Sequence, residues 1–308
     1  MSSNLFFDKS FLKNLRRRQL RTTLVNLLLL SASSLSFIAI VVIIGTLVIE
    51  SSIFFGHVSF IEFITGTEWT VLFEPKKFGV QPLVVATAIT SLIALTVAIP
   101  VGLATAIYLS EYAGPTVRRI VKSTIELLAG IPTVVYGYFA LYFISPNLLM
   151  PLIEGLGVHS ALAVGLTIGV LIIPIVASLS EDAMYSVPED FRLAAYSLGA
   201  RKMDVVFKVV LPAALSGIFA SIILAFTRAM GETMIAAIAG GFRVFYSFDP
   251  REAMQTMTSF IAQVATGDAP HGTVEYQSIF AVGLLLFFVT MVFNVIALLI
   301  VRRWQIRY

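Results

Sequence analysis

The chain of 308 residues is 58% hydrophobic and only 13% charged, and its mean hydropathy is +0.92. A soluble domain is about 45–50% apolar and about 25% charged, so this composition excludes an ordinary soluble enzyme, and it also excludes a disordered chain, which needs low hydrophobicity. The formal net charge is only +3, and the lack of cysteine excludes disulfides and thiolate metal sites. The composition predicts a single polytopic membrane domain.

Six apolar runs follow one another along the chain. A bilayer core of ~30 Å needs about 20 apolar residues of helix, and every run is at least of that length. The runs are continuous rather than alternating in polarity, which favours helices over a β-barrel. The predicted fold is therefore an all-α membrane protein whose six transmembrane helices cover residues 22–49, 83–109, 125–144, 160–179, 213–239 and 278–301.

The two ends of the chain flank this transmembrane domain of residues 22–301. Residues 1–21 mix basic side chains with leucine and phenylalanine, which predicts a cytoplasmic helix that lies in the membrane interface and contacts lipid headgroups. Residues 302–308 are predicted to form a short cytoplasmic tail.

The basic residues are distributed unequally between the two sides of the membrane. Sixteen of the 21 Lys and Arg residues fall in the N-terminus, the second and fourth loops and the tail, and the other side has Lys76, Lys77, Arg243 and Arg251. The positive-inside rule then places both termini in the cytoplasm. The two long loops on the outer side, residues 50–82 and 240–277, are acidic, and they are either solvated connections or a docking surface for an external partner.

The sequence contains none of the motifs that would let this chain perform catalysis. No G-x-x-x-x-G-K-[ST] stretch is present to bind ATP, and no H-E-x-x-H is present to bind zinc. His57, His159 and His271 are far apart in the sequence. We therefore expect no catalytic residue, no metal site and no cofactor in this chain, and the energy for its work would come from elsewhere.

The cytoplasmic loop of residues 181–212 is internally ordered. Pro188, followed by Glu189 and Asp190, predicts the start of a helix, and Gly199 would end it. A second amphipathic stretch, residues 202–211, leads into Pro212 and the fifth span. This helix–glycine–helix unit is either a projection on which a soluble machine acts or a plain connection between two spans.

The loop resembles the E-A-A-x3-G-x9-I-x-L-P loop of ABC-importer permeases, with Val209 at the isoleucine position and Leu193 in place of the usual glutamate. In that family the loop forms coupling helices that sit in a groove of the ATPase subunit. The resemblance implies a type I ABC importer permease fold, and Glu189 or Asp190 would supply the charge that Leu193 lacks. It assigns ATPase coupling to Glu189, Asp190, Ala194, Ala195, Gly199, Arg201, Leu211 and Pro212.

Further stretches resemble the C-type permease subunit of phosphate-specific importers, namely residues 81–83, 106–112, 126–137 and 228–233. This resemblance implies a multi-pass protein of the bacterial inner membrane that carries phosphate. The implied partners are a homologous A-type permease subunit, a dimer of ATPase subunits that holds ATP and Mg, and an extracytoplasmic phosphate-binding protein; nucleic acid is not a partner. Residues 1–80 match only in outline.

Arg228 and Glu232 are charged residues within the apolar fifth run. A charge at the centre of a membrane helix is costly and rarely faces lipid. Four residues apart on one continuous helix, the two side chains would point the same way and could pair. The pair is either structural or part of the substrate pathway, and the family resemblance implies the second role.

A guanidinium suits phosphate because its planar fork makes two charge-assisted bonds. Glu232 would limit affinity or accept a hydrogen bond from protonated phosphate, which sulfate cannot offer. Two alternatives to a phosphate importer are an ABC permease for another oxyanion such as sulfate and a secondary transporter that uses an ion gradient. A separate pattern, Gly165 and Gly169 in the fourth run, permits close helix contact within the subunit or between subunits.

Overall fold

The computed structural model describes residues 9–304, and its described part is built from helices with one isolated β-bridge between Trp69 and Phe78. Of the described helices, five are long and apolar enough to cross a membrane, and a helix pair bent by 85° passes the same test as a broken span or a re-entrant loop. Each of the six predicted runs falls on one of these helices or on the bent pair. The five helices cover Arg21–His57, Gln81–Tyr112, Ala161–Tyr185, Lys202–Met230 and Val274–Leu299, and the bent pair is Pro115–Ala129 with Thr133–Leu149.

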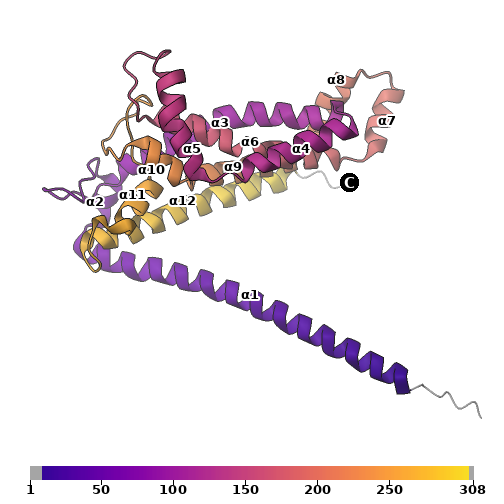
Figure 1. Ribbon diagram of the computed structural model, residues 1–308, viewed down its shortest axis with the longest axis horizontal. Coiled ribbons are helices and arrows are strands. Elements are labelled where there is room, and N and C mark those ends of the chain that lie inside the picture. Colours follow the sequence, from indigo (N-terminus) through magenta and orange to yellow (C-terminus); the bar gives the residue numbers. More distant parts are fainter. Residues whose placement is uncertain (1–8, 305–308) are drawn as a thin grey trace, which may run out of the picture.

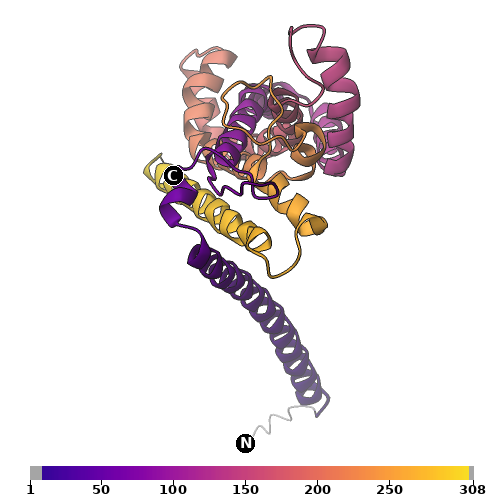
Figure 2. The same cartoon turned by 90° about the vertical axis from the view of Figure 1, so that its left-hand side faces the viewer.

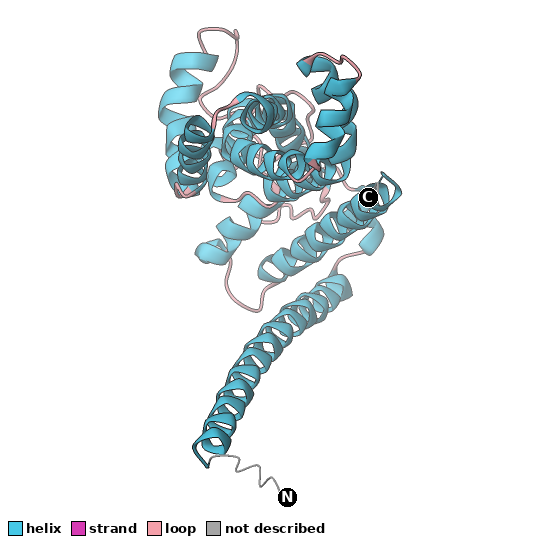
Figure 3. Ribbon diagram, turned by 90° about the vertical axis from the view of Figure 1, so that its right-hand side faces the viewer, coloured by secondary structure: helices cyan, strands magenta, loops and turns pink. Residues whose placement is uncertain are grey.

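The first span belongs to one long helix, α1 (Lys9–His57), which is continuous through Arg21. Residues 9–21 belong to the same continuous helix as the span, and their placement in the membrane interface stays a prediction; residues 1–8 lie outside the described residues. The helix curves gently and leaves the body of the protein (Figure 2; Figure 3). Its apolar side chains from Leu24 to Ile43 are exposed, as suits a surface that faces lipid or another membrane protein.

Four long helices lie side by side in the body of the protein: α3 (Gln81–Ile107), α6 (Ala161–Tyr185), α9 (Leu211–Met230) and α12 (Val274–Trp304) (Figure 1). α3 and α6 pack most extensively. A Cβ on Gly165 would lie 2.6 Å from Ile93 Cβ, and one on Gly169 would lie 3.0 Å from the Ala94 carbonyl oxygen. The two glycines therefore serve a close helix contact within the subunit.

The third predicted span is not a single helix. α4 (Pro115–Ala129) ends before Pro132, after which α5 (Thr133–Phe139) and a π-helical segment, η2 (Ala140–Leu149), turn away by 85°. Proline has no N–H to donate and disfavours helical geometry in the residue before it, so the break falls at Ile131–Pro132. Pro100 and Pro174 are tolerated inside α3 and α6.

One end of the helix bundle holds the two long loops together with three short helices, and we call it the long-loop end (Figure 1). Phe63 and Trp69 from the first loop are buried against Phe260, and the Trp69 and Phe260 rings meet edge to face at 4.9 Å. The first loop is therefore packed into a core and is more than a solvated connection. The short helices are α2 (Phe60–Thr65), α10 (Met234–Gly240) and α11 (Met257–Gln263), and α11 continues as η4 (Val264–Asp268).

The opposite end holds α7 (Glu189–Ser197) and α8 (Lys202–Val205), next to the C-terminal end of α12 (Figure 1). α8 runs through a π-helical segment, η3 (Val206–Val210), into α9, so that Lys202–Met230 is one span. We call this the coupling-loop end. It also holds the π-helical turn η1 (Tyr108–Tyr112), with which α3 ends.

Candidate functional site

The fifth predicted span breaks between its two charged residues. α9 ends at Met230 and α10 starts at Met234, so the prediction of one helix through residues 213–239 is wrong. In a continuous helix the N–H groups of Met234 and Ile235 would bond to carbonyls four residues earlier. Here they donate to Glu232 Oε1 instead, at 3.2 and 3.4 Å. The carboxylate of Glu232 thus caps the start of α10 and ends the preceding helix.

Arg228 and Glu232 still face each other across this break. The Arg228 Nη2 atom lies 3.9 Å from Glu232 Oε2, at the outer limit of an ion pair. The Glu232 side chain is only 3% exposed, while the Arg228 side chain is 49% exposed. The carboxylate is fixed inside the protein, and the guanidinium has most of its donors free for another acceptor.

The break is tied to the second span through α11. Thr258 donates its hydroxyl hydrogen bond to the backbone carbonyl of Glu232 at 2.7 Å. In the next contact, the N–H of Met257 donates to the hydroxyl of Thr87 on α3 at 3.0 Å. All of these groups are buried. The position of the Glu232 turn therefore depends on α11 and on the part of α3 at the long-loop end.

The coupling loop has the helix–glycine–helix form that the sequence predicts. α7 begins after Pro188, and Gly199 has φ +81°. The N–H of Gly199 donates to the Tyr196 carbonyl at 2.9 Å and that of Ala200 to the Ala195 carbonyl at 3.1 Å, which is a Schellman arrangement. Glycine adopts this left-handed conformation without the strain that a Cβ would add.

Most of the predicted coupling residues lie on the surface. Five of the eight are exposed and three are partly buried where the loop meets α9. The exposed ones are Glu189, Asp190, Ala194, Gly199 and Arg201, and the partly buried ones are Ala195, Leu211 and Pro212. Leu193, which stands in the place of the usual glutamate, is exposed as well, and the same surface includes Leu198 (89% exposed), Met203 and Phe207. This surface is more apolar than one that faces water alone requires.

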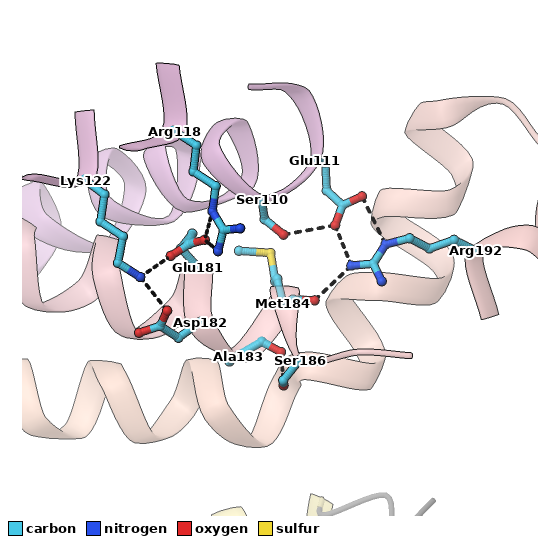
Figure 4. Close-up of polar contacts among 10 residues, drawn as sticks. All are labelled: Ser110, Glu111, Arg118, Lys122, Glu181, Asp182, Ala183, Met184, Ser186 and Arg192. Atoms are coloured by element: carbon cyan, nitrogen blue, oxygen red, sulfur yellow. Dashed lines mark hydrogen bonds and ion pairs between the residues drawn. The ribbon is translucent and has the colours of Figure 1, made fainter. Parts of the chain in front are cut away.

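Sequence reasoning missed an ionic network beneath the coupling loop (Figure 4). The Glu181 side chain is fully buried near the end of α6, and it accepts hydrogen bonds from Arg118 Nε at 2.6 Å and from Lys122 Nζ at 2.7 Å. Lys122 also contacts Asp182 at 2.5 Å. A buried carboxylate needs such partners, and these two cations come from α4, about sixty residues earlier in the sequence.

A second charge pair joins α7 to the end of the second span. Arg192 on α7 donates to Glu111 on η1, with 2.8 Å between Nη2 and Oε1 (Figure 4). Arg192 also donates to the carbonyls of Met184 and Val187, at 2.9 and 2.6 Å. The sequence contains only two signals for this pair: the carboxylate of Glu111 at the end of a long apolar run, and Arg192 next to Leu193.

The two groups of predicted site residues lie at opposite ends of one helical span. Lys202 is at the coupling-loop end, and Arg228 is near the far end of the same span of 29 residues, a length of about 40 Å at 1.5 Å per residue. The structure brings Arg228 to Glu232 and gathers the coupling residues around Gly199, but it keeps the two groups apart. In the described part of the chain, no three His, Asp or Glu side chains are grouped so as to hold a metal ion.

Comparison with known sequences finds a matching protein family and several relatives. A profile of the family described as "Binding-protein-dependent transport system inner membrane component" matches residues 98–306. The probable ABC transporter permease protein YqgH of Bacillus subtilis is 32% identical, with 90% of this chain and 87% of that protein aligned. The phosphate transport system permease protein PstC of Pasteurella multocida is 30% identical, over 94% of this chain and 97% of that protein.

Solved structures share the fold at low sequence identity. A bacterial alginate ABC transporter in complex with a pentasaccharide-bound periplasmic protein has a TM-score of 0.63 at 15% identity, covering 95% of this chain and 97% of that chain. The MetNI methionine ABC transporter in an inward-facing conformation has a TM-score of 0.56 at 18% identity, covering 73% and 94%. The predicted fold class, an all-α permease of the type I ABC importer kind, is confirmed.

Proposed function

Because the chain belongs to the family of inner membrane components of binding-protein-dependent transport systems, we propose that it forms half of the membrane pathway of an ATP-driven inorganic phosphate importer. Support for phosphate comes from relatives named PstC, which are 30–32% identical over most of this chain. Arg228 adds chemical support, since a half-exposed guanidinium beside an apolar span is suited to a tetrahedral oxyanion.

The partners in this proposal supply the second half of the pathway and the ATP-binding sites. A homologous A-type permease subunit supplies the other half of the pathway, and two ATPase subunits hold ATP and Mg and drive transport. They would bind the coupling loop, where the exposed Leu193, Leu198 and Met203 offer an apolar surface. This chain itself would perform no bond chemistry.

The orientation in the membrane follows from the placement of the charges. The coupling-loop end has most of the Lys and Arg residues and would face the cytoplasm, with both termini on that side. The long-loop end would face outward and receive an extracytoplasmic phosphate-binding protein. There the Arg251 guanidinium donates hydrogen bonds to Asp249 and lowers the pKa of that carboxyl to about 2, so this pair stays ionised and adds no net charge to the loop surface.

Arg228 and Glu232 would have different tasks. Arg228 would contact phosphate transiently, because its ion pair with Glu232 is long and leaves its other donors free. Glu232 would hold the turn between α9 and α10 through the N–H groups of Met234 and Ile235. Its negative charge near Arg228 would also weaken the binding of the anion, which a transporter must release.

A permease for another oxyanion, such as sulfate, is the main alternative, and the relative named YqgH has no substrate in its name. A secondary transporter that uses an ion gradient is disfavoured by the family match.

The decisive experiment is uptake by proteoliposomes that contain the whole complex. Radiolabelled phosphate should accumulate when ATP is enclosed with the ATPase subunits, and unlabelled phosphate should compete better than sulfate. Equal competition by sulfate would contradict the substrate, and uptake without ATP would contradict the mechanism.

A further inference from the structure

We infer that Arg192 is a positioning residue that fastens the coupling helix α7 to the second span, so that movement of α7 is passed to α3 through the Glu111–Arg192 pair. The inference rests on the proposed role of residues 181–212 as the ATPase-coupling loop. It adds a route by which movement leaves that loop, besides the chain's own continuation into α6 and α9.

The helix α7 lies on the surface of the coupling-loop end. None of its residues is buried, and Ala195 is its only residue in the partly buried layer of the neighbouring apolar cluster. Arg192, by contrast, donates four hydrogen bonds: two to Glu111, at 2.8 and 3.4 Å, and one each to the carbonyls of Met184 and Val187. A planar guanidinium with both edges engaged fixes orientation as well as distance.

The partner of Arg192 is equally constrained. The Glu111 side chain is only 5% exposed, and beyond Arg192 it accepts one hydrogen bond, from Ser110, at 3.0 Å. A carboxylate buried to this extent needs a cation, because an uncompensated charge in a buried place is strongly unfavourable. The pair therefore stays closed while α7 is pushed or pulled, and force on α7 acts on η1.

A second contact joins the same two parts of the chain. The Lys202 ammonium, which follows Gly199, lies 4.6 Å from the centre of the Tyr112 ring. Thus one residue on each side of Gly199 contacts one of the two consecutive residues Glu111 and Tyr112. The helix–glycine–helix unit meets the end of the second span at two points, so it cannot rotate about one of them alone.

Movement of η1 can be passed along α3 to the other face of the membrane. η1 continues α3, which packs along α6 for most of its length, and Thr87 near the outer end of α3 bonds to Met257 of α11. The neighbouring Thr258 bonds to Glu232. A shift of α3 along its axis is therefore passed, through two buried hydrogen bonds and by way of α11, to the turn that holds Glu232 and faces Arg228.

The test uses the assembled complex in proteoliposomes and measures the uptake of whichever oxyanion the wild-type complex carries, per ATP hydrolysed. Arg192→Gln and Glu111→Gln should each lower this ratio at least fivefold while ATP hydrolysis continues. Lys208→Gln is the matched control, since it breaks an exposed pair with Asp204 in the same loop and should leave the ratio unchanged. An unchanged ratio in the two pair variants overturns the inference.

A rescue separates a mechanical link from a loss of folding. The chain has no cysteine, so a short bis-methanethiosulfonate reagent can join Glu111→Cys to Arg192→Cys without bridging any other site in this chain. The double variant should be uncoupled before treatment and regain at least half of the wild-type ratio after it, whereas treated wild-type complex should not change. A cross-linked complex that hydrolyses ATP but stays uncoupled overturns the inference.

If Arg192→Gln does not assemble, Arg192→Lys provides the folded variant, because it keeps a cation against Glu111 but lacks the planar fork. Partial coupling is then expected, and full coupling counts against the role of the fork. Failure of the proposed function would appear differently, as a wild-type complex that carries no oxyanion or needs no ATP.

Discussion

The guanidinium of Arg228 and the carboxylate of Glu232 lie 3.9 Å apart across the end of α9, where Glu232 caps the next helix and Arg228 remains half exposed. On a continuous helix the two groups would share one face and form an ordinary ion pair, in which neither side chain has a role different from the other. The break assigns them unequal positions, because one is fixed by backbone donors and the other is free to meet a ligand.

Removal of the Arg228 charge should abolish most transport without affecting assembly. Arg228→Gln is expected to lower phosphate uptake at least tenfold, because the neutral amide cannot make two charge-assisted bonds to one anion. The measurement is uptake by proteoliposomes, with ATP hydrolysis by the same complex as the assembly check. Arg119→Gln, which alters an exposed arginine of α4, is the control. Uptake at the wild-type rate in Arg228→Gln would remove this residue from the pathway.

Two substitutions at Glu232 should have different effects. Glu232→Gln keeps an oxygen that can accept from the N–H groups of Met234 and Ile235, so it should fold normally and bind anions more tightly, with slower release. Glu232→Ala loses the cap and should destabilise the protein by about 1 kcal/mol. Denaturation in mixed detergent micelles reports the stability, and the concentration dependence and maximal rate of phosphate uptake report the binding and release of the anion. Equal stability of the two variants would contradict the capping role.

Loss of the buried Glu181 carboxylate should destabilise the protein strongly only if Arg118 and Lys122 are still present. Glu181→Ala leaves Arg118 and Lys122 facing each other, and we expect a loss toward the lower end of about 3–5 kcal/mol, since both cations are about one quarter exposed. Replacing all three by Leu, Met and Met should cost much less, because no buried charge is left unpaired and the Asp182 carboxylate, which loses Lys122, is more than half exposed. Denaturation midpoints test this, and a triple variant that is no more stable than Glu181→Ala would disprove it.

Ser180 and Ser221 form a buried hydrogen bond of 2.8 Å between α6 and α9. Both residues lie within spans, where such bonds between helices contribute about 0.6 kcal/mol on average in mutant cycles. A double-mutant cycle with Ser180→Ala and Ser221→Ala should give a coupling energy of that order from denaturation midpoints. Strictly additive single effects would mean that the two hydroxyls act independently.

Gly199 is the position in the coupling loop where a side chain should be harmful even in open space. A Cβ there meets no atom within 4 Å, but φ is +81°. Gly199→Ala should therefore cost about 1 kcal/mol in backbone strain and weaken ATPase binding, while Gly199→Asn should be milder because asparagine tolerates this conformation better. Co-purification of the ATPase subunits measures the effect, and the exposed Ser197→Ala on α7 is the control. An alanine variant equal to wild type would show that the turn can change its conformation freely.

The long helices of the fold were predictable from the sequence. The apolar runs are about as long as the bilayer core requires, and Pro188 and Gly199 predicted the bounds of α7 to within a residue or two. These signals are local, because hydropathy and backbone preference belong to consecutive residues. The break at Pro132 was only half predictable: proline indicated a kink, but the 85° turn depends on what α4 and α5 pack against.

The arrangement of the charged groups could not be predicted in the same way. The pairing of Glu181 with its cations and of Arg192 with Glu111 depends on contacts between residues 59 to 81 positions apart, and no periodic pattern in the sequence indicates these contacts. The end of α9 at Met230 was only weakly marked in the sequence, by Gly231, which lies at the C-cap of the helix. The carboxylate of Glu232 then accepts from the backbone donors at the start of α10, and no pattern in the sequence indicates that contact. By itself the sequence determined that this is a helical membrane protein with several apolar spans and where its coupling loop turns, because hydrophobic length and glycine conformation are properties of short segments. The tertiary structure alone decided which charges neutralise one another and which one stays free, because a buried charge is stable only beside partners that folding brings to it.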